Sequence, residues 1–408
     1  MPALRPGTQV RDSNRWVALI AIGLLALNLR TAVASLSPII GFIEADFPLS
    51  ILQVALIGAA APVAFGASGV ITRMLVGKRS IEYALRIVLS LLVIGGLLRG
   101  LAWNGDSLFL GSVLALLGMG IGNVLIPSLV RRYFPRRIGL LTSFYITMTS
   151  ISATLPPLVA VPVSESLGWR SSLLVWVMAA LLASPAVWLI SRNRFREPKI
   201  TATSRGLAIW KSPTAWAIAG LFALTSTIGY TSFAWLPQLM REHSGLNPAA
   251  AGATLGLFAL MGFLPSILVP IVAERWRQSQ LPIVLFSISS AMAGAVGLIL
   301  YPTSQPWLWV TLLGLGPTMF PLALAMFNLR SESRATVLRV SAFGTSIAYG
   351  VSSVMVLLAG LLRQLTGGWD AHLAAVALMA ALALLGAYQI SKHQTVDSEL
   401  GVTAKRLN

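Results

Sequence analysis

The stretch ALNLRTAVASLSPII, residues 26–40, contains a permanent positive charge within an apolar segment. The apolar segment begins near Trp16, so Arg30 lies roughly 21 Å along a helix axis at 1.5 Å per residue. That depth is well inside a bilayer whose hydrocarbon core is about 30 Å thick. A charge placed there is expensive, and such residues usually serve the function of the protein. The stretch therefore predicts a membrane helix that carries a functional cation.

The composition also indicates a polytopic membrane protein. Of the 408 residues, 56% are hydrophobic and 11% are charged, whereas a soluble domain carries roughly 25% charged residues. The net charge of +17 is compatible with nucleic-acid binding, but the basic residues are scattered between apolar runs. The absence of cysteine excludes disulfides, Cys-ligated metals and thiol catalysis. We expect membrane lipid around the protein and no nucleic-acid partner.

Apolar runs of about 20 residues predict an all-α protein with twelve transmembrane helices. A polar, basic segment, residues 191–213, divides the chain near its middle and is expected to be a cytoplasmic linker. The predicted six-helix halves are residues 1–190 and 214–408. The predicted spans are residues 16–41, 50–74, 83–103, 107–130, 138–163, 170–190, 214–239, 248–272, 281–301, 307–328, 335–361 and 370–390.

The charges predict an orientation. Of the 30 Lys and Arg, Arg30 and Arg99 lie within predicted spans, and Arg170, Arg241 and Arg363 lie in loops on one side. All the others fall in the two tails and in the loops on the opposite side, so both termini should be cytoplasmic. We expect the protein in the inner (plasma) membrane of a bacterial cell. No carboxylate is expected inside a span.

The two halves share short sequence repeats. LLGMG at residues 116–120 recurs as LLGLG at residues 312–316, and Gly168-Trp169 recurs as Gly368-Trp369. Two related six-helix halves around a central cavity form the pseudo-twofold arrangement of many secondary transporters. A channel needs no such duplication, so the repeats favour a transporter.

Enzymatic chemistry is poorly supported by the residues. The three histidines lie in or near loops, and no cluster of metal ligands or nucleophile–base pair accompanies them. The phosphate-binding motif G-x-x-x-x-G-K-[ST] does not occur. We therefore expect no catalytic residue, no metal and no cofactor. Gradient-coupled transport or facilitated diffusion of a small molecule remains.

Polar side chains within the spans are candidates for the cavity. In TSFYITMTSIS, residues 142–152, the side chains of Thr142, Tyr145, Thr149 and Ser152 share one helix face. The alternative is that Ser and Thr bond back to helix carbonyls or pack between helices. The predicted substrate-binding residues are Arg30, Asn28, Asn123, Tyr145, Thr149, Ser226, Tyr230, Trp235, Thr345 and Tyr349.

Several of these segments together resemble the cyanate and 2-nitroimidazole transporter family of the major facilitator superfamily. The matching stretches are NLRTAVASLSPII, GMGIGNVLIPSLVRRYFPRRIGLLTSFY, LGWR and AWLPQLM. The resemblance implies alternating access, with Arg30 near the cavity and Arg99 a structural or outer-vestibule residue. Thr225 and Thr345 stand where this family would lead us to expect glutamines, so the substrate can differ.

Three functions are compatible with the sequence. The first is a transporter of a small anionic or nitrogen-containing polar solute, with Arg30 as its counter-charge. A proton-coupled multidrug exporter is the second, which would favour a larger aromatic pocket and a membrane carboxylate. The third is a membrane sensor that uses the same fold without transport. We expect a monomer in each case.

The orientation gives the first testable prediction. Reporter fusions at residue 200 and at the carboxyl tail should report the cytoplasm, and a fusion at residue 244 should report the opposite side. A cytoplasmic signal at residue 244 would contradict the count of twelve spans.

Overall fold

A computed structural model describes residues 12–78, 80–190, 208–275 and 280–401, and the described residues are helical without strands. Eleven helices in this part of the chain are long and apolar enough to span a membrane. The longest, α7 (Ile138–Ile190), is two helices joined at Gly168, whose φ of +81° is a conformation that favours glycine. The predicted twelve-span, all-α fold is confirmed.

The first six spans are α1 (Asp12–Ala26) continued by α2 (Thr31–Ala34), η1 (Ser37–Ile39) and α3 (Ile40–Glu44), then α4 (Ile51–Lys78), α5 (Ile81–Gly100), α6 (Gly105–Tyr133) and the two parts of α7. The second six are α8 (Pro213–His243), α9 (Pro248–Met261) with α10 (Phe263–Arg275), α11 (Leu281–Leu300), α12 (Pro306–Leu315) with η3 (Gly316–Thr318) and α13 (Met319–Leu329), α14 (Arg334–Thr366) and α15 (Asp370–Ser391). Two short helices, η2 (Ile209–Lys211) and α16 (Val396–Glu399), lie outside the spans.

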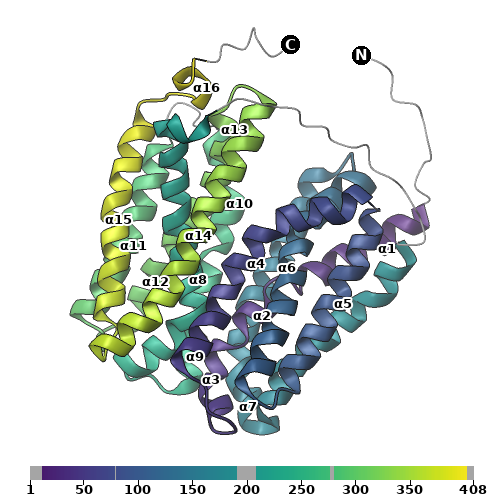
Figure 1. The fold of residues 1–408 in the computed structure, drawn as a ribbon, viewed down its shortest axis with the longest axis vertical. Helices are drawn as coiled ribbons and strands as arrows, with labels where there is room; N and C mark the ends of the chain where they lie inside the picture. The colour runs from purple at the N-terminus through teal and green to yellow at the C-terminus, as the bar shows by residue number, and fades with distance from the viewer. Residues whose placement is uncertain (1–11, 79, 191–207, 276–279, 402–408) are drawn as a thin grey trace.

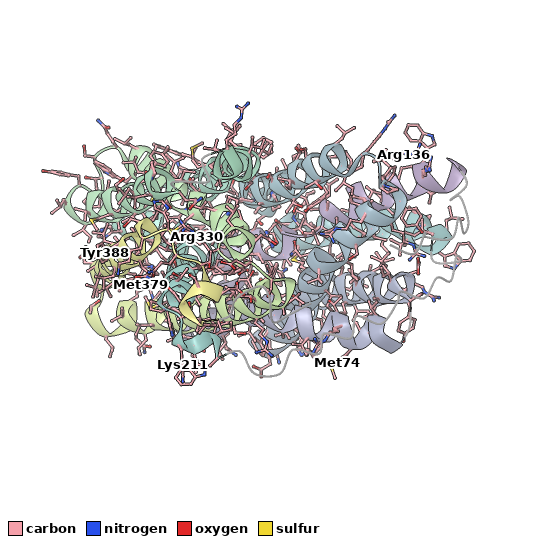
Figure 2. The ribbon with its side chains drawn as sticks, turned by 90° about the horizontal axis from the view of Figure 1, so that it is seen from above. Met74, Arg136, Lys211, Arg330, Met379 and Tyr388 are labelled. Atoms are coloured by element: carbon pink, nitrogen blue, oxygen red, sulfur yellow. The ribbon has the colours of Figure 1, made fainter. Side chains whose placement is uncertain are left out.

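The spans form two bundles that lie side by side (Figure 1). We call the end of the bundles at which residue 12 and residue 401 lie the terminal end, and the opposite end the distal end. Seen from the terminal end, Arg136 lies over the first bundle and Arg330 over the second (Figure 2). Between the bundles, α4 packs against α14 and α7 packs against α9.

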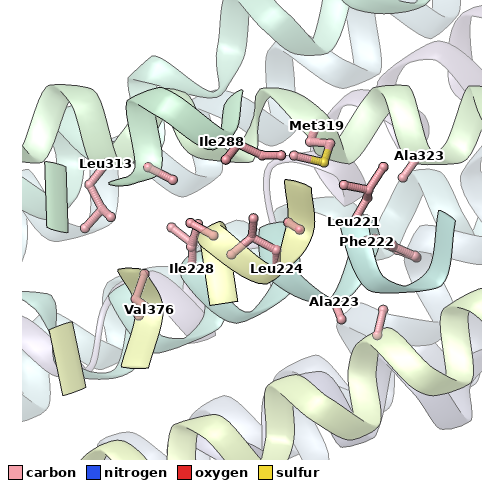
Figure 3. Close-up of a cluster of buried hydrophobic side chains, with 14 of the residues drawn as sticks. Leu221, Phe222, Ala223, Leu224, Ile228, Ile288, Leu313, Met319, Ala323 and Val376 are labelled. Atoms are coloured by element: carbon pink, nitrogen blue, oxygen red, sulfur yellow. The ribbon is translucent and has the colours of Figure 1, made fainter. Parts of the chain in front are cut away.

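The larger apolar core lies mostly in the second bundle and extends to residues of the first bundle such as Val54 and Ala59. In the second bundle, α8 packs against α13, α14 and α15, and its Leu221, Phe222 and Ile228 lie in the larger core cluster (Figure 3). A second core joins α1, α4, α5 and α6 in the first bundle. Burial inside the protein is thus greatest for α8, of which 78% of the apolar window is buried.

The two bundles contain equivalent close contacts between their own helices. A Cβ built on Gly95 of α5 would lie 2.5 Å from the backbone nitrogen of Ala115, and one built on Gly294 of α11 would lie 2.5 Å from that of Leu313. No real side chain tolerates such an approach, so glycine is required at both positions. The third and fourth spans of each half therefore pack in the same way, which supports the proposed division into two related halves.

The repeated Gly-Trp pair forms the same contact twice at the distal end. The indole Nε1 of Trp169 donates to Oδ2 of Asp46 at 2.9 Å, and that of Trp369 donates to Oε2 of Glu242 at 2.9 Å. An arginine pairs with each carboxylate: Arg170 with Asp46, and Arg363 with Glu242. The hydrogen bond from Trp169, together with Arg170, lowers the pKa of the Asp46 carboxyl. We call these contacts the distal clamps.

The expectation that no carboxylate lies inside a span is wrong. The helix α5 begins at Ile81, two residues before the predicted start, and places Glu82 in its first turn. The Glu82 carboxylate is buried, and Arg132 of α6 reaches it with Nη1 at 2.9 Å. A charge-paired carboxylate can be buried because its partner offsets part of the desolvation cost.

The linker and the carboxyl tail meet the second bundle at the terminal end. Residues 191–207 of the predicted linker lie outside the described residues, but Ile209 is buried in the second core. In the tail, Asp397 accepts hydrogen bonds from the backbone of Glu332 at 2.7 Å and from Thr336 at 2.5 Å. Glu399 accepts from Thr214 Oγ1 at 2.6 Å. The short helix α16 thus ties α8 to α14.

The distal clamps give a prediction on stability. The substitution Trp369→Phe keeps the ring but removes a donor to the Glu242 carboxylate, which should cost about 1.5–3 kcal/mol and lower the thermal unfolding temperature. The matched control is Trp103→Phe, which changes an indole that is 67% exposed at the same end. Equal unfolding temperatures of the two variants in detergent would show that the clamp contributes no stability.

Candidate substrate-binding site

The first span is interrupted where the sequence predicts its functional cation. The helix α1 ends at Ala26 and α2 begins at Thr31, and in between the chain tightens, with the N–H of Asn28 donating to Leu25 O at 2.9 Å. The backbone N–H of Arg30 does not bond within its own span. It donates to Oγ of Ser152 on α7 at 2.9 Å. Because water is scarce at this depth, the Ser152 hydroxyl supplies a partner that the broken helix lacks.

The guanidinium of Arg30 is half-buried and faces an aromatic ring. Its Cζ lies 4.9 Å from the centroid of the Phe65 ring on α4. Its hydrogen bond to Leu29 O is long, at 3.5 Å, and the ion pairs found among the described residues do not include it. A cation–π contact is worth about 0.5–2 kcal/mol, and an arginine at mid-span costs about 2.5–3.5 kcal/mol. The charge is therefore only partly offset by protein groups.

Aromatic rings connect Arg30 to the second bundle. The Phe65 ring lies 6.0 Å from Tyr230 on α8, which lies 5.9 Å from Tyr349 on α14. Tyr349 in turn lies 5.7 Å from Phe222. Both tyrosine hydroxyls interact electrostatically with each other and with the Arg30 guanidinium. These distances are those of edge-to-face or tilted aromatic pairs.

We call Arg30, Phe65, Ser152, Tyr230 and Tyr349 the central site. All five lie near the middles of their spans, and they come from both bundles. The site offers a cation, two hydroxyls that can donate or accept, and ring faces. Such a set can bind a small solute that has an electronegative or anionic end and a flat or apolar remainder.

Among the predicted binding residues, Arg30, Tyr230 and Tyr349 are brought together. Tyr145 and Thr149 are half-buried on α7, and the Thr149 hydroxyl donates to Tyr145 O at 2.8 Å, as the packing alternative anticipated. Asn123 likewise bonds back along its own helix, to Met119 O at 3.2 Å.

Of the other predicted residues, three are buried and one is half-buried. Asn28 is 2% exposed and donates to Leu24 O at 2.8 Å, within the first bundle. Trp235 is 1% exposed, and its indole donates to Val356 O at 3.0 Å. Ser226 is buried without a hydrogen-bond partner among the described residues, and Thr345 is half-buried on α14. Their roles in binding remain predictions.

Sequence reasoning did not select Phe65 or Ser152 as binding residues. Phe65 lies in AAAPVAFGASG and is the only aromatic residue of α4. A single ring among small residues could have marked it as a candidate for the site. Ser152 shares the predicted helix face of Tyr145 and Thr149, but a serine alone resembles the packing serines common in spans. In the parts of the chain that the structure describes, no group of three His, Asp or Glu could hold a metal ion.

The fold and the central site point to a membrane transporter, and sequence comparison identifies its class. Residues 19–351 match the model of the Major Facilitator Superfamily, and the chain belongs to this family.

The chain is similar to three bacterial transporters over most of its length. It is 30% identical to the uncharacterized transporter YycB of Bacillus subtilis (strain 168), over 90% of this chain and 91% of that one. It is 28% identical to the 2-nitroimidazole transporter of Escherichia coli (strain K12), over 92% and 95% of the two chains. It is 27% identical to the cyanate transport protein CynX of the same organism, over 86% and 91%.

Solved structures share the fold at lower identity. The crystal structure of a D-xylose-proton symporter superposes with a TM-score of 0.72 at 14% identity, over 93% of this chain and 99% of that one. The resemblance confirms the arrangement of the spans. The family match, rather than this structural likeness, makes the chain an integral membrane transporter of a small molecule.

The placement of the side chains gives a prediction on accessibility. The protein has no native cysteine, so single cysteines can be probed with a membrane-impermeant thiol reagent on purified protein. Cysteines replacing Tyr349 and Thr345 should react, because both positions are half-buried near the centre, and a cysteine replacing Trp235 should not, because it is packed against Gly360. Equal reactivity at residues 235 and 349 would contradict this assignment of the central site.

Proposed function

We propose that this protein is a secondary active or facilitative transporter that moves a small anionic or nitrogen-containing polar solute by alternating access. The observation that carries the proposal is the Arg30 guanidinium, which faces the Phe65 ring and acts electrostatically on Tyr230 and Tyr349, but is in none of the ion pairs found among the described residues. A solute with negative charge density would supply the missing counter-charge. Arg30 is thus assigned to the substrate's anionic or electronegative end.

The relatives support a small nitrogen-containing solute. One is named a transporter of 2-nitroimidazole and another a cyanate transport protein. Cyanate is a linear anion and a nitroimidazole is a flat ring with an electron-rich nitro group, so both present oxygen atoms that a guanidinium can bind. The rings of Phe65, Tyr230 and Tyr349 would face the remainder of such a solute.

Close packing between the bundles near the distal end closes that side of the central site, as expected for one state of an alternating-access transporter. A Cβ built on Gly58 of α4 would lie 2.7 Å from Cβ of Ala234 on α8, and one built on Gly252 of α9 would lie 2.9 Å from Pro157 O on α7. These contacts join the two bundles between the central site and the distal loops. With the predicted orientation, the closed side is the outer side, and the substrate would enter or leave through the cytoplasmic side.

A second candidate function is the export of a larger aromatic compound. The observation that favours it is the continuation of the rings beyond Tyr349, because Phe222 lies 5.4 Å from Phe320 and 6.0 Å from Phe327. An exporter driven by protons also needs a group that exchanges them. The buried carboxylate Glu82 is paired with Arg132 at the terminal end of the first bundle, away from these rings. A series of substrates of increasing size would separate the two functions.

Substitution of Arg30 tests the proposed function. Arg30→Lys keeps the charge but loses the planar fork, so binding should weaken roughly tenfold, which corresponds to about 1.4 kcal/mol. Arg30→Ala should abolish binding while the empty protein unfolds at the wild-type temperature or above it, because a buried charge has been removed. The measurements are the thermal shift caused by cyanate, nitrite and 2-nitroimidazole, and uptake of the binding solute into liposomes.

The matched control is Arg136→Ala, which removes an exposed arginine from the loop between α6 and α7. This variant should bind and transport as the wild type does. If Arg30→Ala binds and transports as well as Arg136→Ala, Arg30 is not the counter-charge of the substrate.

A further inference from the structure

A second intramembrane arginine lies inside the first bundle, away from the central site. Arg99 is in the last turn of α5 and is 3% exposed. It borders a cavity of about 20 Å³, which we call the Arg99 cavity. The cavity is lined by Asn28, Thr31, Ala32, Ser35, Leu92, Gly96, Arg99, Ala115, Met119, Leu173, Trp176 and Val177.

The unpaired polar atoms at this cavity are all hydrogen-bond donors. Nε and Nη2 of Arg99 are buried without a hydrogen-bond partner among the described residues, and so is the indole Nε1 of Trp176. Donors cannot satisfy one another, and a buried donor without an acceptor costs about 1–3 kcal/mol, more when it is charged. The lining contains no carboxylate. Its side-chain oxygens, on Asn28, Thr31 and Ser35, are neutral, so the cavity lacks a negative charge to balance Arg99.

Half-buried Arg132 and buried Arg330 show what Arg99 is missing. Arg132 pairs with the Glu82 carboxylate at 2.9 Å. Arg330 donates to Oε1 of Gln280 at 2.6 Å and to Ile390 O at 3.1 Å. Both receive acceptors from the protein itself. For Arg99 no residue of the lining carries a negative charge, so a counter-charge has to come from a bound ion.

The size of the cavity limits that guest to a few atoms at most. A volume of about 10–15 Å³ is needed to hold one water molecule, and the Arg99 cavity has about 20 Å³. A water molecule would fill the space but would leave the charge uncompensated. We propose that the Arg99 cavity binds one small monovalent anion of the halide class, held by the guanidinium of Arg99 and the indole N–H of Trp176.

This site lies directly behind the break in the first span. Asn28 and Thr31 line the Arg99 cavity, and the Thr31 hydroxyl donates to Asn28 O at 3.2 Å. Arg30, between them in sequence, faces Phe65 on the other side. The bound anion would hold the broken segment from within the bundle, so its effect on stability is separable from substrate binding at the central site.

The test compares thermal unfolding of the purified full-length protein in sodium chloride and in sodium gluconate at equal concentration. A ligand that binds only the folded state raises the unfolding temperature, so chloride should raise that of the wild type by roughly 2 °C or more. Arg99→Met removes the charge and should abolish the shift. Trp176→Phe removes one donor and should raise the chloride concentration that gives a half-maximal shift by roughly tenfold, about 1.4 kcal/mol.

Two matched controls locate the effect. Trp188→Phe makes the same change on the same helix at an indole that is 52% exposed, and it should keep the wild-type shift. Arg30→Ala should also keep it, because Arg30 faces the central site. If Arg30→Ala abolishes the chloride shift and Arg99→Met does not, the halide binds at the central site and the proposal for Arg99 is wrong.

A direct measurement remains decisive if Arg99→Met fails to fold. Crystals grown in sodium bromide should show an anomalous bromine peak in the Arg99 cavity of the wild type, weakened in Trp176→Phe. A cavity that contains only water, together with equal unfolding temperatures in chloride and gluconate, would overturn the proposal.

Discussion

The break in the first span, at residues 27–30, is the constraint on which both arginine sites depend. In a continuous helix the backbone N–H and C=O groups bond to one another. Where a helix is broken inside the membrane, some of these groups lose their partners and need others. Here the Arg30 backbone N–H donates to Oγ of Ser152, and the Thr31 hydroxyl donates to Asn28 O. The broken segment can therefore turn Arg30 toward Phe65 while Asn28 and Thr31 face the Arg99 cavity.

The joint between the two bundles consists of different contacts at different depths. Near the distal end, glycines such as Gly58 and Gly252 allow backbones to approach closely. At the centre, the joint is made of rings, with Phe65 of the first bundle against Tyr230 of the second. An aromatic pair contributes only about 0.5–1.5 kcal/mol beyond its burial. In the proposed transport cycle, such contacts can be exchanged for contacts with substrate at little cost.

The same set of contacts occurs at the distal end of each bundle. A tryptophan after a glycine donates its indole N–H to a carboxylate, and an arginine neutralises that carboxylate. The two clamps use Asp46 with Arg170 and Glu242 with Arg363, so the acid and the position of the arginine differ. The tryptophan donor is common to both clamps, whereas the left-handed glycine directly precedes it in the first (Gly168) and lies two residues before it in the second (Gly367).

The sequence by itself determined the number of spans, the all-α class and the place of Arg30 within the first span, because hydropathy and charge act locally and add up along the chain. It also selected Tyr230 and Tyr349. Only the tertiary structure decided which polar side chains meet. Asn28 and Arg30 were predicted for one site, but Asn28 lines the Arg99 cavity while Arg30 faces Phe65. Trp235 lies on the same helix as Tyr230 but is buried against Val356, and Phe65 joins the site from another helix. Glu82 was assigned to a loop, but α5 begins at Ile81 and includes it, and Arg132 of α6 pairs with it. Such contacts depend on how each helix is rotated and on which neighbour it packs against, and these are properties of the folded bundle rather than of any one segment.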